Sequence, residues 1–271
     1  MLNFRNICNC SGIFIWEMLE VLNESKLLEM NNKDITPPPP RSHTLNELLT
    51  LADGRIHASG SAGALALGKA CSRDKAWEHC YEFFSLHEQE LRHPSPSQDL
   101  LVRAATEVSC YLAFFGMFRG SSKLLNTNRD FFIPVIQSCW QQVPEGFHPM
   151  GTTDPVFVTN TRKALRKSLK EQFNRISPTT PISDILVSKI MLGMFACTPA
   201  YDRNVKQGIA TFSYPELVPS FDANIKKWHV FMGNEAVDAF FTEKRKFYYG
   251  PNSKIPLNRI ADLFFFQLGL T

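Results

Sequence analysis

Three side chains able to do chemistry, Tyr201, Asp202 and Arg203, follow one another in Cys197-Thr-Pro-Ala-Tyr-Asp-Arg-Asn-Val205. Pro199 ends the apolar segment before them, which places Asp202 at the first turn of the next helix. Free backbone amides and the helix dipole stabilise a carboxylate there as an anion. Such an anion could stabilise an oxocarbenium-like sugar and orient a water during base excision. The alternative is a plain N-cap, which is the commonest role of an aspartate at this position.

The segment from Asp184 to Val205 resembles one block of the helix-hairpin-helix DNA glycosylase superfamily. In that block an apolar helix beginning near a lysine runs through small residues to a proline, and a short loop then presents an aspartate. The residues in comparable order are Lys189, Gly193, Phe195, Pro199, Asp202 and Val205. The resemblance implies catalytic roles for Asp202 and Lys189, a DNA substrate and a two-lobed helical arrangement.

The chain departs from that family in three ways. Thr180-Pro-Ile-Ser183 stands where the family has a glycine-rich hairpin that holds a DNA phosphate. The spacing from lysine to aspartate is shorter, and the cysteines of an iron–sulfur cluster are absent from the sequence. The chain is also similar to a group of uncharacterised bacterial proteins that share Arg-Gly-Ser-Ser, Pro-Ala-Tyr-Asp-Arg and an aromatic C-terminal helix.

A second group of polar residues, Arg119-Gly-Ser-Ser-Lys123, follows the most apolar helical segment. Its cations, hydroxyls and amides are typical of a phosphate site. The alternative is a helix C-terminal signal in which Gly120 ends one helix and Ser122 caps the next turn. In a base-excising enzyme, Arg119, Ser121 and Ser122 would contact phosphate or base. Tyr201 and Phe118 would stack on the flipped base, and Arg203 would be the partner of Asp202.

A basic amphipathic helix is predicted over residues 160–176. Arg162, Arg166 and Lys170 fall at i, i+4 spacing on one line, and Lys163 and Lys167 fall on the next. Like charges at this spacing destabilise an isolated helix, and a phosphate backbone would relieve the repulsion. These five residues are therefore candidates for contacting the nucleic-acid backbone. The alternative is an ordinary solvated helix face.

Hydrophobic periodicity predicts a mainly α protein with a single globular multi-helix domain of roughly ten helices over residues 42–271. Residues 1–41 are predicted to be a peripheral segment ending in a proline linker, and Met30 is an alternative start to Met1. Residues 156–158 are the only candidate for a short strand. The main predicted helices cover residues 75–91, 98–125, 131–143, 160–176, 181–195, 219–232, 237–248 and 256–268.

Several classes of function find no support in the sequence. It lacks the nucleotide-binding glycine loops, the zinc-hydrolase motif and the serine-hydrolase motif, and its seven histidines show no metal-ligand spacing. We therefore predict neither a metal nor a cofactor.

Seven cysteines without a Cys-x-x-Cys pair indicate reduced thiols and a cytoplasmic protein. No apolar run approaches the length that spans a bilayer. A net charge of +3 is too small to argue for nucleic acid by itself.

The leading hypothesis is a DNA glycosylase-like N-glycosyl hydrolase, acting in repair or in defence against phage by excising modified viral bases. A non-enzymatic nucleic-acid-binding protein is the second hypothesis. A helical interaction module, in which Asp202 and Arg203 form a buried structural ion pair, is the third. The sequence leaves open which base is excised, whether the DNA is single- or double-stranded, and the oligomeric state.

Overall fold

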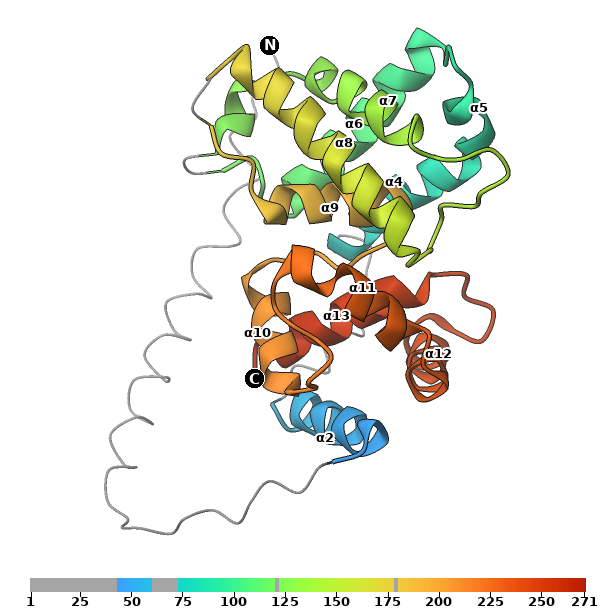
Figure 1. Cartoon of the computed structure of the whole chain (residues 1–271), viewed down its shortest axis with the longest axis vertical. Helices are drawn as coiled ribbons and strands as arrows, with labels where there is room; N and C mark the ends of the chain where they lie inside the picture. Colours follow the sequence, from blue (N-terminus) through green and yellow to red (C-terminus); the bar gives the residue numbers. More distant parts are fainter. Residues whose placement is uncertain (1–42, 60–72, 120–121, 178–179) are drawn as a thin grey trace, which may run out of the picture. The chain divides into compact units, whose positions relative to one another are not determined.

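The computed structural model describes residues 43–59, 73–119, 122–177 and 180–271, and His43–Thr271 form one compact unit (Figure 1). The described residues contain helices and connecting loops but no strand, which confirms the mainly α prediction. The α-helices are α2 (Leu45–Ala58), α4 (Arg73–Leu86), α5 (Glu88–Arg92), α6 (Gln98–Phe114), α7 (Ile133–Trp140), α8 (Pro155–Asn174), α9 (Asp184–Phe195), α10 (Arg203–Phe212), α11 (Phe221–Met232), α12 (Glu235–Tyr249) and α13 (Leu257–Leu268). Two 3₁₀ turns, η2 (Lys123–Asn126) and η3 (Arg129–Phe132), precede α7.

Side-chain caps fix where many of these helices begin. Thr44 and Glu47 form the predicted capping box of α2. The Ser183 hydroxyl accepts from the Leu186 amide at the start of α9. Asp154 accepts from Phe157 N at 2.7 Å, and Pro155 occupies the first position of α8. The strand predicted at residues 156–158 is therefore wrong, because this cap and proline start a helix there.

The helix predicted over residues 98–125 is also too long. It ends at Phe114, and Gly116 adopts φ +70° immediately afterwards. The Gly116 amide bonds to Ala113 O and the Met117 amide bonds to Leu112 O, both at 2.9 Å. This is a Schellman ending with glycine at the left-handed position. Gly116 thus ends the helix, rather than Gly120.

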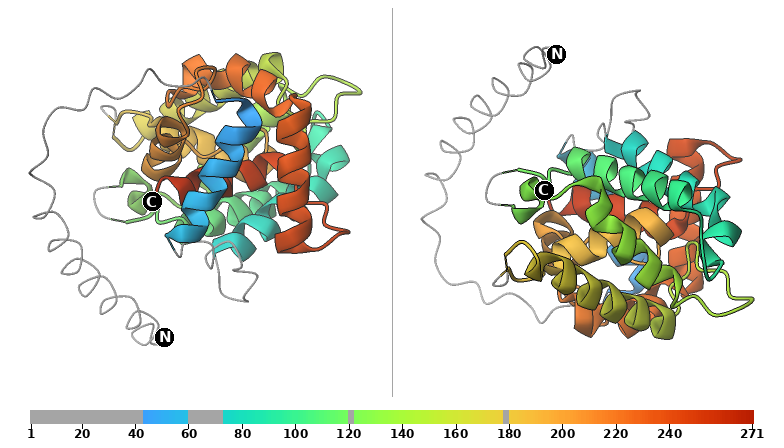
Figure 2. Two further views of the ribbon diagram at one scale, coloured as in Figure 1. Left: turned by 90° about the horizontal axis from the view of Figure 1, so that it is seen from below. Right: turned by 90° about the horizontal axis from the view of Figure 1, so that it is seen from above.

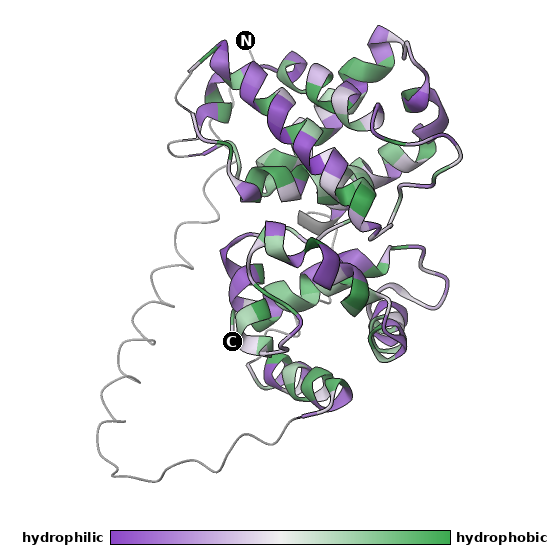
Figure 3. Ribbon diagram, viewed as in Figure 1, coloured by the Kyte–Doolittle hydropathy of each residue, from purple (hydrophilic) through white to green (hydrophobic). Residues whose placement is uncertain are grey.

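The helices fall into two groups that share one core. Helices α4 to α9 pack mainly on one another, and α2 packs across α10, α12 and α13 (Figures 1 and 2). Buried apolar side chains from both groups belong to one continuous cluster. Helix α9 is mainly apolar, as its mostly green ribbon in Figure 3 shows, and every residue from Leu186 to Phe195 is buried. None of the described helices is both long and apolar enough to cross a membrane.

Helices α10 and α13 make the most extensive helix contact in the described residues, with their backbones touching. A methyl group built on Gly208 would lie 1.9 Å from the carbonyl oxygen of Phe265. A methyl group on Gly269 would lie equally close to the carbonyl oxygen of Asn204. Neither glycine has a positive φ, so glycine is required at both positions by close approach alone.

This contact predicts a large effect of one added methyl group. We expect Gly208→Ala to lower the free energy of unfolding by about 3 kcal/mol or more, because the methyl meets backbone that cannot rotate away. Gly54→Ala is the matched control, since Gly54 lies within α2 with no neighbouring atom within 4 Å of an added methyl. The control should gain up to about 1 kcal/mol from helix propensity. Urea denaturation of both variants tests the prediction, and equal midpoints would contradict it.

Candidate functional site

Asp202 caps α10 with one of its two carboxylate oxygens. Oδ1 accepts from the amides of Asn204 and Val205, each at 3.1 Å. The N-cap considered from the sequence is therefore present. The second oxygen is left to face other groups, so capping does not account for the whole carboxylate.

That second oxygen faces Lys189. Asp202 Oδ2 lies 3.8 Å from Lys189 Nζ. The Lys189 side chain is 7% exposed and that of Asp202 is 20% exposed, so the pair lies at the edge of the interior. Lys189 Nζ also donates to Phe115 O at 3.4 Å and lies over the Phe115 ring. The structure thus brings together the two residues to which the sequence assigned catalytic roles.

Two further charged residues, Arg259 and Asp262 of α13, lie beside this pair and were missed by the sequence analysis. Both are almost completely buried, and Arg259 Nη1 contacts Asp262 Oδ2 at 2.5 Å. The Arg259 guanidinium lies 5.0 Å from the centre of the Trp77 ring. Two opposite charges at i, i+3 in an otherwise uncharged C-terminal helix were the available signal.

Burial raises the pKa of Asp262 to about 6, against the opposing effects of Arg259 and of the Ala200 amide, and the nearby Asp202 carboxylate adds to the rise. Asp262 Oδ1 accepts from Ala200 N at 2.8 Å, two residues before Asp202. Asp262 therefore holds the loop that presents Asp202.

Tyr111 of α6 contributes a hydroxyl to the same region. Its ring packs against Gly193, where an added methyl would lie 2.6 Å from a ring carbon. The Tyr111 hydroxyl is buried and has no hydrogen-bond partner among the described residues. Burial raises its pKa, Arg259 opposes the rise, and Asp262 and Asp202 add to it. Lys189, Asp202, Arg259 and Asp262 form a charge cluster. The charges of Arg259, Asp262 and Asp202 act on the Tyr111 hydroxyl, which therefore lies near three of its four members.

Tyr201 lies in the core and not on a cleft wall. Its ring is 1% exposed and stacks on Phe221, with 4.8 Å between ring centres. Its hydroxyl accepts from Asn224 Nδ2 at 2.7 Å, and its amide donates to the Ser188 hydroxyl. A ring enclosed in this way offers no face to a nucleobase. Tyr201 instead anchors the loop before Asp202 to α9 and α11.

The predicted partner of Asp202 is also different. Arg203 is exposed at the first turn of α10, and Lys189 takes the place at Asp202 that the sequence analysis gave to Arg203. Arg203 does not reach Asp202 because its side chain points outward from α10, whereas Asp202 Oδ2 points inward to Lys189.

The residues after α6 form a turn of their own. Ser122 accepts from the Leu124 amide at 3.3 Å and so caps η2, which agrees with the structural alternative for this motif. Arg119 is exposed, and Phe118 is partly buried against the core. Ser121 lies outside the described residues. Within the described part of the chain, no hydrogen bond or ion pair joins Arg119 or Ser122 to Asp202.

The predicted basic face of α8 divides into two sets. Arg162 and Arg166 are partly buried and both pair with Asp184, and Arg162 also pairs with Asp222. These two arginines tie α8 to α9 and α11, so their guanidinium groups are already occupied. The three predicted lysines, Lys163, Lys167 and Lys170, are exposed.

Outside the charge cluster, the described residues show no comparable group of metal-ligating or nucleophilic side chains. In the described part of the chain, no three His, Cys, Asp or Glu side chains gather closely enough to hold a metal ion. The thiols of Cys80, Cys139 and Cys197 are buried and form no disulfide among the described residues. Burial raises the pKa of Cys139 to about 12 and that of Cys80 and Cys197 also well above the ordinary value. Such thiols are poor nucleophiles at neutral pH.

Comparison with known proteins adds no relative. No protein-family model, curated protein or solved structure matches the chain. The glycosylase resemblance therefore rests on the residues from Asp184 to Val205 alone.

The raised pKa of Asp262 should make the stability of the protein depend on pH. Its folded pKa of about 6 exceeds the ordinary 3.8, so the folded state binds this proton more tightly and ionisation of Asp262 opposes folding. The stability of the native protein relative to Asp262→Asn should therefore fall by about 2 kcal/mol between pH 4 and pH 7, with most of the change below about pH 6. Chemical denaturation at each pH measures this difference. Asp238→Asn, at an exposed position, is the control, and a pH-independent difference for Asp262→Asn would contradict the prediction.

Proposed function

We propose that the protein is a DNA glycosylase-like N-glycosyl hydrolase in which Asp202 and Lys189 form the reactive pair. The observation that carries this proposal is the 3.8 Å approach of Lys189 Nζ to the uncapped oxygen of Asp202. The resemblance of the surrounding block supports it. The adjoining buried charges of Arg259 and Asp262 support it too, because clusters of perturbed ionisable groups gather at functional sites.

The reaction is a hydrolysis of the bond between a base and C1′ of its sugar. As this bond breaks, the base leaves with the bonding electrons and positive charge develops on the sugar. The Asp202 carboxylate stabilises that charge and takes a proton from the attacking water. The oxygen of the water bonds to C1′, and the proton passes on to the departing base. Lys189 holds the reacting oxygen of Asp202 in place. Its amine is also the kind of group that attacks C1′ in enzymes that form an imine.

The side from which a nucleotide can reach Asp202 and Lys189 determines how DNA would bind. Asp202 is the more exposed member, so the nucleotide approaches from the start of α10. Arg203, exposed beside Asp202, is the proposed phosphate contact there, and Arg119 with Ser122 is the proposed contact after α6. A base-excising activity would serve repair or the removal of modified viral bases. The thiols, which form no disulfide among the described residues, fit the cytoplasm as its place.

Base excision is tested by incubating the full chain with single- and double-stranded DNA carrying modified or ordinary bases, followed by alkali. We expect strand breaks at abasic sites and a rate at least about 100-fold lower for Asp202→Asn. Asparagine caps helices as well as aspartate does, so this variant should keep its fold. Lys189→Gln should also lose activity, whereas Lys226→Gln, at an exposed position on α11, should not.

Borohydride trapping on the same substrates reports whether the Lys189 amine forms an imine with the opened sugar. Absence of breaks on every substrate, or full activity of a folded Asp202→Asn variant, would remove this proposal.

The exposed lysines of α8 favour a second candidate function, nucleic-acid binding without catalysis. Unlike Arg162 and Arg166, Lys163, Lys167 and Lys170 have no ion pair with a described residue. They therefore remain available to phosphates.

The test of this second function compares two triple variants of equal charge. Replacing Lys163, Lys167 and Lys170 with Gln should weaken DNA binding and lower the slope of log K against log salt by about 2 to 3. Replacing the exposed Lys226, Lys246 and Lys254 with Gln changes the net charge equally, from +3 to 0, and should have a smaller effect. If both triple variants lose the same affinity, DNA binding depends on net charge and not on the lysines of α8. No binding at low salt would leave the helical interaction module as the remaining hypothesis.

A further inference from the structure

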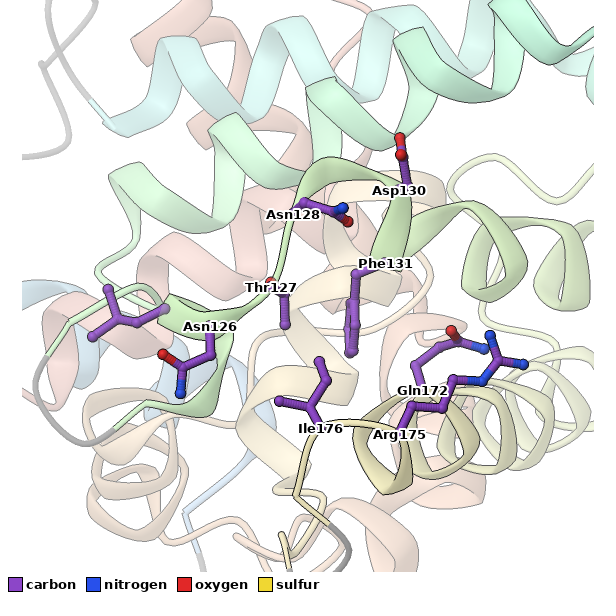
Figure 4. A pocket seen from close by; sticks show the side chains of 9 residues that line it. Asn126, Thr127, Asn128, Asp130, Phe131, Gln172, Arg175 and Ile176 are labelled. Carbon is purple, nitrogen blue, oxygen red and sulfur yellow. The ribbon is translucent and has the colours of Figure 1, made fainter.

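A pocket of about 590 Å³ lies between residues 125–131 and the last turn of α8 (Figure 4). It takes its walls from two segments that are more than 40 residues apart in the chain. The six residues that matter here are Asn126, Asn128, Phe131, Gln172, Arg175 and Ile176. None of them belongs to the charge cluster around Asp202, so the pocket is a separate feature.

Three side-chain amides border this pocket without partners. Those of Asn126, Asn128 and Gln172 form no hydrogen bond with any described residue, and Asn128 precedes η3 without capping it. Gln172 is the most informative, because it is only 7% exposed. Its carboxamide atoms are not among the buried polar atoms without a partner, so they still reach solvent at the pocket wall. Figure 4 shows Gln172 beside Phe131, at the pocket wall. The amide is therefore placed to bind a group that enters the pocket.

The same wall carries a positive charge that no carboxylate neutralises. Arg175 is exposed and has no ion pair with a described residue. Asp130 also borders the pocket, but it lies 3.7 Å from Arg129 and points away from Phe131 in Figure 4. The guanidinium of Arg175 is thus available to an anion such as phosphate, which it can bind through two parallel N–H groups.

Apolar groups complete the pocket. Phe131 is 6% exposed and is held edge-on against Phe173, with 4.9 Å between ring centres. Ile176 is 41% exposed and lies below Phe131 in the view of Figure 4. The exposed side chain of Ile176, with the small exposed part of the Phe131 ring beside it, provides an apolar surface for a flat ring. The volume lies in the range of small-molecule sites, and the lining combines three apolar residues with six polar ones.

We infer that this pocket binds a nucleotide. The base lies against Phe131 and Ile176, its polar edge meets the amides of Gln172, Asn126 and Asn128, and its phosphate pairs with Arg175. Carboxamides both donate and accept, so they can meet the mixed edge of a base. The nucleotide is either free or part of a single strand. This inference does not depend on the proposed base excision, because it concerns other residues and equilibrium binding.

The test is calorimetric titration of the full chain with nucleoside 5′-monophosphates, with inorganic phosphate and with single-stranded ten-nucleotide oligomers. We expect a nucleotide or an oligomer to bind at least about tenfold more tightly than inorganic phosphate. Arg175→Gln and Gln172→Leu should each weaken that binding, the first by at least about tenfold. Arg129→Gln is the matched control, since it removes the same charge from a neighbouring exposed arginine outside the pocket lining.

The titrations distinguish a free nucleotide from a single strand as the ligand, and both from results that overturn the inference. Binding of oligomers alone assigns the pocket to single strands, and binding of mononucleotides alone assigns it to a free ligand. Unaltered binding in both Arg175→Gln and Gln172→Leu would overturn the inference, as would equal affinity for inorganic phosphate or no binding at all. Gln172→Leu removes no hydrogen bond to a described residue, so its unfolding midpoint should match that of the native protein. Loss of base excision with intact nucleotide binding would affect only the earlier proposal.

Discussion

The backbone contact between α10 and α13 is the constraint on which the candidate site depends. Gly208 and Gly269 let the two helices approach until the carbonyl oxygens of Phe265 and Asn204 fill the space that other side chains would need. Asp262 lies about one turn before Phe265 on α13. The close approach therefore brings its carboxylate within 2.8 Å of the Ala200 amide. Without this close approach of α10 and α13, the loop before Asp202 would lose its hydrogen bond to Asp262 of the C-terminal helix.

The same approach creates an energetic problem. Lys189, Arg259 and Asp262 are nearly buried, and Asp202 adjoins them. Moving charges out of water is costly, and mutual attraction repays this only with good geometry. Apolar residues of similar volume often stabilise a core at least as well. Stability alone is therefore a poor reason for keeping two cations and two carboxylates at this place. That imbalance is the physical argument for looking for chemistry at Asp202.

The sequence predicted the features that local rules decide. The cap at Thr44, the cap at Asp202 and the mainly apolar helix α9 each depend on residues within a few positions. Features decided by tertiary contacts escaped it. Tyr201 looked available until Phe221 and Asn224 enclosed it. The sequence analysis missed the pair of Arg259 and Asp262, because no local rule shows that both sides of α13 are covered.

Helix α8 shows why charge spacing alone does not identify a binding surface. Arg162 and Lys163 are neighbours in sequence, yet carboxylates from α9 and α11 neutralise the first and none pairs with the second. Gln172, nine residues after Lys163, lies on the opposite side of the helix, because nine residues make two and a half turns. The exposed lysines and the amide pocket are thus different surfaces of one helix. The partners that other helices bring to α8 decide which of its cations remain available to a ligand.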